Sequence, residues 1–314
     1  MTILVTGGLG FIGLHTARHL LDAGEDLVLT QFRVARAPDF IKDEFGKRAF
    51  IEQLDVQNYD NLLEIGKKHK IDKILHLAVP GLGALNPADD FRTNMNGLLN
   101  ILEAARAWEV KRLGLASSNA IYTGENEGPF KEDMKLRVQM STVNPTEAYK
   151  KAFEVLGSHY AQRTGMDIVM LRIAGIYGPL YHSMANLPSR LTHAAVKGEA
   201  PVLRGNEFED DGNDMCYVKD CAQGLAKIMT AESLPNRIYN VGAGRETKNK
   251  ELVAAIKAIV PNAELPLKEG SSANRNNAYG DITRARQDVG YEPQFPIDKA
   301  IEDYVGWLRA GNAQ

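Results

Sequence analysis

The sequence predicts an α/β fold built on a doubly wound parallel sheet, with a smaller lobe formed by the C-terminal part of the chain. Through the first half, short aliphatic runs alternate with stretches of helical periodicity. These runs are apolar throughout rather than at every second residue, as strands that are covered on both faces require. A glycine-rich turn then joins the first run to the first helix, which is typical of doubly wound sheets.

The expected strands of the first half are runs of β-branched or aliphatic residues. In chain order they are ILVT (3–6), LVLT (27–30), AFIEQLDV (49–56), KILHLA (73–78), LGLASS (113–118) and IVMLRI (168–173). Helices with one apolar face are expected between them at 11–23, 59–69, 87–108 and 145–164. Because parallel strands end at one edge of a sheet, we expect a ligand site beyond their carboxyl ends.

From about residue 178 the pattern changes to turn-rich sequence with shorter elements. Helices are expected near 187–197, 219–231, 248–259 and 297–309, and short strands near 201–203 and 215–218. No clean linker separates the two parts. The sequence therefore predicts a first domain over residues 1–177, with residues 178–314 forming mainly a second lobe.

Composition excludes several classes of protein. The 314 residues carry 37 basic and 40 acidic side chains. The chain therefore lacks the excess of positive charge that is typical of nucleic-acid-binding proteins. No apolar run approaches the roughly 18–20 residues of a membrane span, and strand-like sequence from Thr2 leaves no room for a signal peptide. We therefore expect a cytoplasmic protein without a membrane partner. Two cysteines cannot form a zinc site, and His15 and His19 lack a third ligand, so no metal is predicted.

The turn TGGLGFIG places Gly7, Gly10 and Gly13 in a G-x-x-G-x-x-G pattern. Glycines let the backbone approach a pyrophosphate, and the N-terminus of the following helix offers free N–H groups. A strand before the turn and a helix after it are the context that this motif needs. The first domain is therefore predicted to be a dinucleotide-binding Rossmann domain, and the second lobe to bind the substrate.

Further motifs follow the glycine turn. They are LDV at 54–56, HLA at 76–78, the N-x-N-G of Asn94–Gly97, SS-x-x-x-Y at 117–122 and YGP at 177–179. From Thr2 to about Leu308, the chain resembles the extended short-chain dehydrogenase/reductases of the NAD-dependent epimerase/dehydratase family. The resemblance implies an enzyme with a nicotinamide cofactor and a small-molecule substrate. It implies cofactor contacts at Gly7, Gly10, Phe11, Ile12, Gly13, Gln31, Arg33, Asp55, Val56, Leu77, Ala78, Val79, Asn94 and Lys150.

The end of the second strand bears on the choice between NAD and NADP. Family members that use NAD usually carry an acid there for the ribose diol, but this chain has Gln31, followed by Arg33 and Arg36. A neutral side chain removes repulsion of a 2′-phosphate, and a guanidinium can bind one in bidentate fashion. These residues favour NADP over NAD.

The catalytic positions depart from the family pattern. The resemblance assigns Ser118 to the reacting oxygen and Lys150 to the nicotinamide ribose, since Glu154 and Arg172 follow Lys150 at the family's spacing. The usual tyrosine position, four residues before the lysine, then holds Thr146. Tyr149 lies on nearly the same helix face, and we predict that its phenol carries the proton, with Thr146 as a relay. Tyr181 and His182 are the alternative proton carriers.

The substrate positions depart as well. Family members that bind nucleotide sugars usually have Asn where this chain has Gly175, and Arg where it has Asn213. Losing a charge-assisted phosphate contact is not a neutral change. The loop at 205–214 adds acidic residues where a dianion would pass. Three arginines outside the motif are candidate substitutes: Arg190, Arg204 and Arg275.

Three functions remain open from the sequence. The favoured one is an NAD(P)-dependent oxidoreductase acting on a small polyol, hydroxyketone or hydroxy acid. The second is a nucleotide-sugar 4-epimerase or dehydratase with a shifted acid/base, and the third is a non-catalytic dinucleotide sensor. A homodimer through the helices around 87–108 and 145–164 is also predicted, because the run GLLNIL (97–102) is apolar on more than one face.

Overall fold

The computed structural model describes residues 1–33, 35–79, 85–139, 145–272 and 275–312, and its largest feature is a seven-stranded sheet. The strand order is β10-β6-β5-β4-β1-β2-β3, and every pairing is parallel. The predicted doubly wound α/β class is thus confirmed. The strands are β1 (Thr2–Thr6), β2 (Asp26–Gln31), β3 (Ala49–Gln53), β4 (Lys73–His76), β5 (Arg112–Ser118), β6 (Ile168–Ile173) and β10 (Ile238–Val241).

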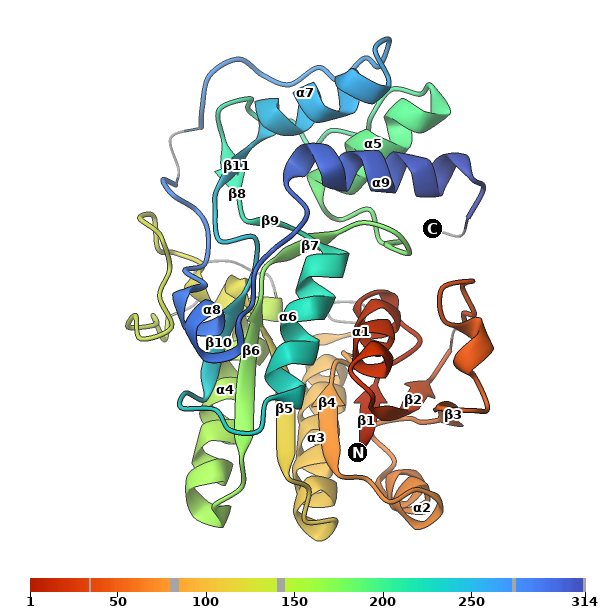
Figure 1. Ribbon diagram of the computed structural model, residues 1–314. Coiled ribbons are helices and arrows are strands. Elements are labelled where there is room, and N and C mark those ends of the chain that lie inside the picture. The colour runs from red at the N-terminus through yellow and green to blue at the C-terminus, as the bar shows by residue number, and fades with distance from the viewer. Residues whose placement is uncertain (34, 80–84, 140–144, 273–274, 313–314) are drawn as a thin grey trace.

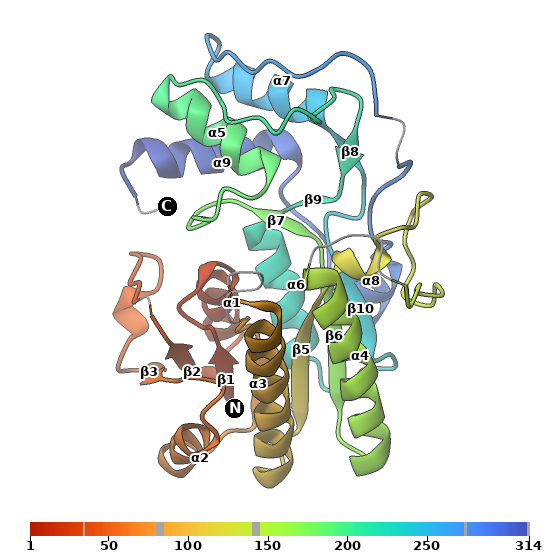
Figure 2. The same ribbon diagram turned by 180° about the vertical axis from the view of Figure 1, so that it is seen from behind.

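Helices cover both faces of this sheet, as its continuously apolar strands require (Figures 1 and 2). One face packs against α1 (Phe11–Asp22) and α6 (Val218–Thr230). The other face packs against α2 (Tyr59–Lys68), α3 (Pro87–Ala107) and α4 (Pro145–Thr164). Across the described ranges, no helix has the length and apolarity needed to cross a membrane.

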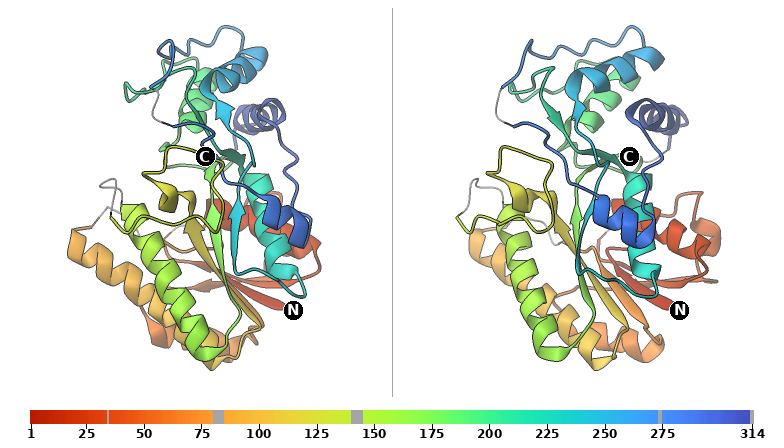
Figure 3. Two further views of the ribbon diagram at one scale, coloured as in Figure 1. Left: turned by 90° about the vertical axis from the view of Figure 1, so that its left-hand side faces the viewer. Right: turned by 60° about the vertical axis from the view of Figure 1, so that its left-hand side comes forward.

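A separate lobe with its own apolar core lies beyond the carboxyl ends of the strands (Figure 3). Its helices are α5 (Leu187–Lys197), α7 (Asn249–Ile259) and α9 (Ile297–Arg309), which pack through residues such as Leu191, Leu252 and Ile301. Four short strands join it to the sheet: β7 (Gly175–Tyr177), β8 (Gly212–Asn213), β9 (Met215–Tyr217) and β11 (Thr247–Lys248). The strand expected at 201–203 is absent, and that prediction was wrong, since these residues are irregular and partly exposed.

Part of the C-terminal half returns to the large sheet. Strand β10 pairs with β6, α6 packs on α1, and the short helix α8 (Thr283–Val289) packs beside β10. Residues 178–314 therefore contribute both to the domain built on the large sheet and to the lobe. The division at residue 177 stays a prediction about where the lobe begins.

Candidate active site

The glycine turn between β1 and α1 is shaped for close contact with a ligand. Gly7 has a φ of +68°, and a Cβ there would lie 3.2 Å from the backbone of Ala78. A Cβ on Gly13 would lie closer to the Gly7 carbonyl oxygen than real atoms approach. Helix α1 begins without a side-chain cap at Gly10, so the free N–H groups of its first turn remain for a ligand. The turn therefore fits a pyrophosphate.

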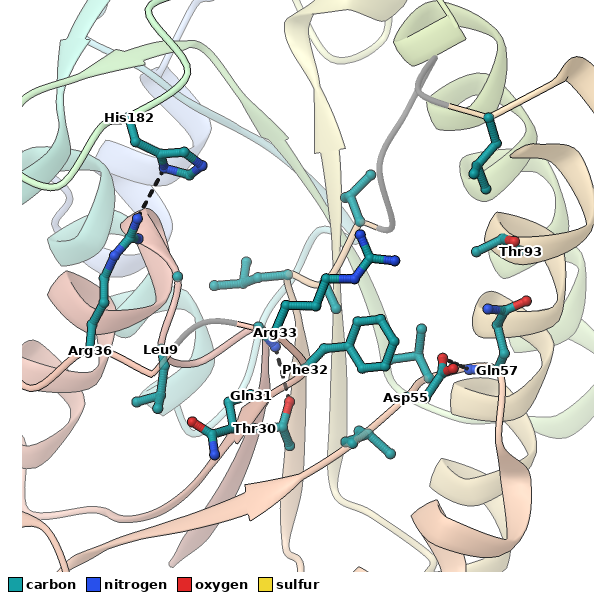
Figure 4. A pocket seen from close by; sticks show the side chains of 18 residues that line it. Leu9, Thr30, Gln31, Phe32, Arg33, Arg36, Asp55, Gln57, Thr93 and His182 are labelled. Atoms are coloured by element: carbon teal, nitrogen blue, oxygen red, sulfur yellow. Dashed lines mark hydrogen bonds between the residues drawn. The ribbon is translucent and has the colours of Figure 1, made fainter. Parts of the chain in front are cut away.

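A cavity of about 450 Å³ opens from this turn along the ends of β2, β3 and β4 (Figure 4). Apolar atoms of Leu54 and Val56 and polar groups of Gln57 and Arg33 face it, a mixture suited to a nucleoside. The predicted cofactor residues that line it are Gly7, Gly10, Gln31, Arg33, Asp55, Val56, Leu77, Ala78 and Val79. Residues that line it without having been predicted include Leu9, Thr30, Phe32, Leu85 and Thr93.

The rim of this cavity is basic at the end of β2. The Arg33 guanidinium lies 5.1 Å above the Phe32 ring and is exposed. Arg36 lies 3.1 Å, Nη2 to Nδ1, from His182, which comes from the segment after β7 (Figure 4). Asp55 is the acidic residue on this wall, and its Oδ1 accepts the backbone N–H of Gln57 at 3.0 Å.

Besides Lys150, four of the predicted cofactor residues do not line the cavity. Phe11 packs against the Tyr181 ring at 5.0 Å, and Ile12 packs on the core beneath α1. Asn94 is buried in α3 and donates from Nδ2 to the Asp90 carbonyl oxygen at 2.9 Å. Gly13 lies under the turn, where it permits the close packing of α1.

Lys150 is buried where α4 crosses the end of β5. Its Nζ donates to the Ala116 carbonyl oxygen at 2.7 Å and lies 4.9 Å from the Phe153 ring centre. Burial lowers the pKa of Lys150 to about 8. One turn further, Glu154 accepts hydrogen bonds from Ser117 at 2.6 Å and from Arg172 at 2.9 and 2.8 Å. This buried network fixes the register of α4 against β5 and β6.

The remaining predicted catalytic residues are Ser118, at the end of β5, and Thr146 and Tyr149, in the first turns of α4. Ser118 ends β5, and its Oγ accepts the backbone N–H of Ala120 at 3.1 Å, capping the short helix η2 (Asn119–Tyr122). At about 100° per residue, Thr146 lies one turn from Lys150 and only about 40° away around the helix. Tyr149 instead packs against α3, with its ring centre 6.2 Å from that of Phe91. Burial, with a smaller contribution from Asp90, raises the pKa of Tyr149.

His76 is a buried neighbour of Lys150 that the sequence did not single out. Its Nδ1 lies 2.7 Å from the Thr6 hydroxyl, and its ring stacks on Phe153. Burial and the Lys150 charge lower its pKa to about 3, so His76 is neutral at physiological pH. It therefore supplies no competing positive charge beside Lys150.

A second cavity of about 430 Å³ lies between η2 and the lobe. The two departures predicted from the sequence, Gly175 and Asn213, both line it, as do Arg190 and Arg204. Arg275 does not line it, since its guanidinium lies 4.9 Å above the Phe130 ring. Polar residues that line it and that the sequence reasoning missed include Asn119, Asn186 and Asn249. Asn186 could have been found, because it precedes Leu-Pro and caps α5 through the Ser189 N–H.

Known proteins resemble the chain over nearly its whole length. Residues 3–242 match the sequence model described as the NAD dependent epimerase/dehydratase family. A UDP-glucuronate 4-epimerase of Thermodesulfobacterium geofontis is 29% identical over 326 residues, which cover 98% of this chain and 95% of that protein. A dTDP-glucose 4,6-dehydratase of Escherichia coli is 26% identical over 341 residues, covering 98% and 93%.

Solved structures show the same architecture. A UDP-glucose 4-epimerase of Thermus thermophilus in complex with NAD has a TM-score of 0.79 at 25% identity, covering 98% of this chain and 99% of that one. A UDP-glucose 4-epimerase of Thermotoga maritima with UDP-glucose has a TM-score of 0.82 at 24% identity, covering 99% of each chain.

Proposed function

The chain belongs to the NAD dependent epimerase/dehydratase family, as its motifs predicted, and from this premise we propose that it transfers hydride at a secondary alcohol or ketone of a small polar substrate. Its relatives make it an NAD-dependent enzyme of the extended short-chain dehydrogenase/reductase type. The observation that carries the proposal is the position of the buried Lys150. It bonds the carbonyl oxygen of Ala116, which lies two residues before Ser118 at the end of β5.

The proposed roles follow from this arrangement. A nicotinamide dinucleotide, when bound, supplies the hydride acceptor or donor. The turn of Gly7 and Gly10 holds its pyrophosphate, and the Lys150 ammonium orients its ribose. Ser118 holds the reacting substrate oxygen, and a hydroxyl on α4, from Thr146 or Tyr149, moves the proton.

The substrate is proposed to lack a diphosphate, because Asn213 and Gly175 line the second cavity where nucleotide-sugar enzymes usually present Arg and Asn. We expect UDP, GDP and dTDP to bind the cofactor-loaded protein only weakly, as calorimetry can measure. Turnover of polyols and hydroxyketones, followed by cofactor absorbance, tests the reaction itself. Micromolar binding of any of the three nucleotides would favour the second candidate below.

The second candidate is a nucleotide-sugar 4-epimerase or dehydratase with a shifted acid/base. The names of the relatives support it, since both the 29%-identical and the 26%-identical proteins act on nucleotide sugars by name and match 98% of this chain. The non-catalytic sensor has no comparable support, because these named relatives are enzymes.

We propose NADP as the preferred cofactor, although the solved relative from Thermus thermophilus carries NAD. The exposed guanidinium of Arg33 at the cavity rim, beside the neutral Gln31, supports this choice. NADPH should bind more tightly than NADH, and Arg33→Ala should remove the difference, as fluorescence titration of both cofactors would show. An unchanged preference in Arg33→Ala would refute the role of this arginine.

A homodimer through α3 and α4 is also proposed. Leu99 on α3 is 50% exposed, and Val155 and Leu156 on α4 are 69% and 40% exposed, which leaves an apolar face that association would cover. Sedimentation should show a dimer at micromolar concentration, and Val155→Glu should weaken it. A wild-type protein that sediments only as a monomer would contradict the proposal.

A further inference from the structure

The second cavity contains a buried ion pair that the proposed reaction does not use. Arg190 of α5 donates from Nη2 to Glu207 at 2.7 Å, and both side chains are only 8% exposed. Both Glu207 oxygens accept the backbone N–H of Arg204 at 2.9 Å, and one accepts that of Asn206 at 3.2 Å. The carboxylate is therefore folded back into a cradle made by its own loop and by α5.

The cradle has the chemistry of an anion site. Burial lowers the pKa of Arg190, the Arg204 charge lowers it further, and the Glu207 carboxylate opposes this shift. Arg190 Nη1 donates to the Ala185 carbonyl oxygen at 2.9 Å, while its Nε has no hydrogen-bond partner among the described residues. The Arg190 guanidinium and the backbone N–H groups of Arg204 and Asn206 converge on one point, and such a set of donors can bind a phosphate. Here that point is occupied by Glu207.

The charge of the cavity follows from its other acidic residues. Asp211 accepts hydrogen bonds from Ser271 and from the backbone of Ser272 at 2.7 and 2.9 Å. Asp214 is buried, and burial raises its pKa to about 6, so it is mostly ionised at neutral pH. With Glu207, these acids outnumber the two arginines that line the cavity. A dianion entering it would meet a net negative charge.

We propose that Glu207 determines substrate specificity by masking a latent anion site formed by the Arg190 guanidinium and the backbone N–H groups of Arg204 and Asn206. The cavity then admits uncharged polyols and hydroxyketones and excludes nucleoside diphosphates and hydroxy acids. This inference rests on the proposed function, whose substrate class it narrows. Glu207 then excludes anionic substrates in addition to the effect of Asn213, which replaces the arginine that the family usually has there.

Glu207→Gln is the sharpest test, because the amide keeps the size of the carboxylate but loses the charge that holds it on Arg190 and the backbone N–H groups, so an anion can displace it. Arg190 is then left without its ionic partner. The probes are inorganic pyrophosphate and UDP, titrated by calorimetry into cofactor-saturated protein so that the dinucleotide site is closed to them. Glu207→Gln should bind both about 10- to 100-fold more tightly than the wild type, the worth of one charge-assisted hydrogen bond.

Two further variants serve as controls. Glu207→Gln/Arg190→Met should lose the gain, and Asp211→Asn, which removes a charge from the same cavity but frees no arginine, should gain less. Unchanged affinity in a folded Glu207→Gln protein would overturn the proposal. So would micromolar binding of UDP by the wild type, a measurement that needs no variant to fold. If Glu207→Gln binds pyrophosphate and UDP more tightly but the protein does not turn over polyols, the role of Glu207 is supported and the proposed reaction is refuted.

Discussion

Lys150→Met should lower kcat/KM for carbonyl reduction by about 100-fold or more, the usual loss when one preorganised electrostatic contact is removed. Lys150 is the buried cation at the end of β5, where it bonds the Ala116 carbonyl oxygen at 2.7 Å. Methionine has a similar length and no charge, so the packing at the end of β5 should be kept while the proposed contact to the cofactor ribose is lost. Steady-state kinetics at fixed pH measures the loss.

The pH dependence of the wild type should report the same lysine. Burial lowers the pKa of Lys150 to about 8, so its ammonium form declines in the free enzyme as the pH rises above that value. Because kcat/KM reports groups of the free enzyme, reduction should slow above about pH 8. Lys150→Met should lack this limb of the profile.

Folding stability should change with pH in the opposite direction to activity. Between about pH 8 and the ordinary lysine pKa of about 10.4, the unfolded chain binds a proton that the folded chain has released. The contribution of Lys150 to stability therefore rises with pH across that window, and Lys150→Met should melt no lower than the wild type. Arg163→Met, an exposed change on the same helix, is the matched control and should alter neither kcat/KM nor the melting temperature. Full activity in Lys150→Met would remove the basis of the proposed mechanism.

The sheet and the glycine turn could be predicted because local sequence determines them. Leu4, Val28 and Ile74 are fully buried in runs too apolar for a half-exposed strand, and Gly7 needs its positive φ whatever the rest of the chain does. Strand β10 was missed because IYNV spans only four residues, and its role depends on pairing with the distant β6.

The substrate cavity could be predicted only in outline. The acid-rich loop at 205–214 was expected to oppose a dianion, but sequence could not show that Glu207 folds back onto Arg190, which precedes it by 17 residues. That contact depends on how α5 and the loop pack in three dimensions. The strand expected at 201–203 did not form either, and Val202 in that run is 75% exposed rather than packed against a neighbouring strand.

The placement of Tyr149 bears directly on the proton route. Helical spacing predicts that it shares a face with Thr146, but spacing cannot tell which neighbour fills that side. In the structure Tyr149 packs on α3 beside Phe91, and burial and Asp90 raise its pKa. A base near neutral pH needs the opposite shift. On this geometry we propose Thr146 as the proton carrier, and Tyr149, which the sequence favoured, as the alternative.

We therefore expect Thr146→Val to cost about 100-fold or more in turnover, and Tyr149→Phe less than about tenfold. The Thr146 hydroxyl, one turn from Lys150 on nearly the same face, can both accept and donate a hydrogen bond. It can thus pass a proton between the substrate oxygen and Lys150, whose pKa of about 8 suits proton exchange. Both variants keep side-chain shape, and thermal melting checks their folds. The reverse ordering would mean that the Tyr149 ring leaves α3 when cofactor binds. Equal activity in both would show that neither hydroxyl moves the proton and that Lys150 exchanges it with water.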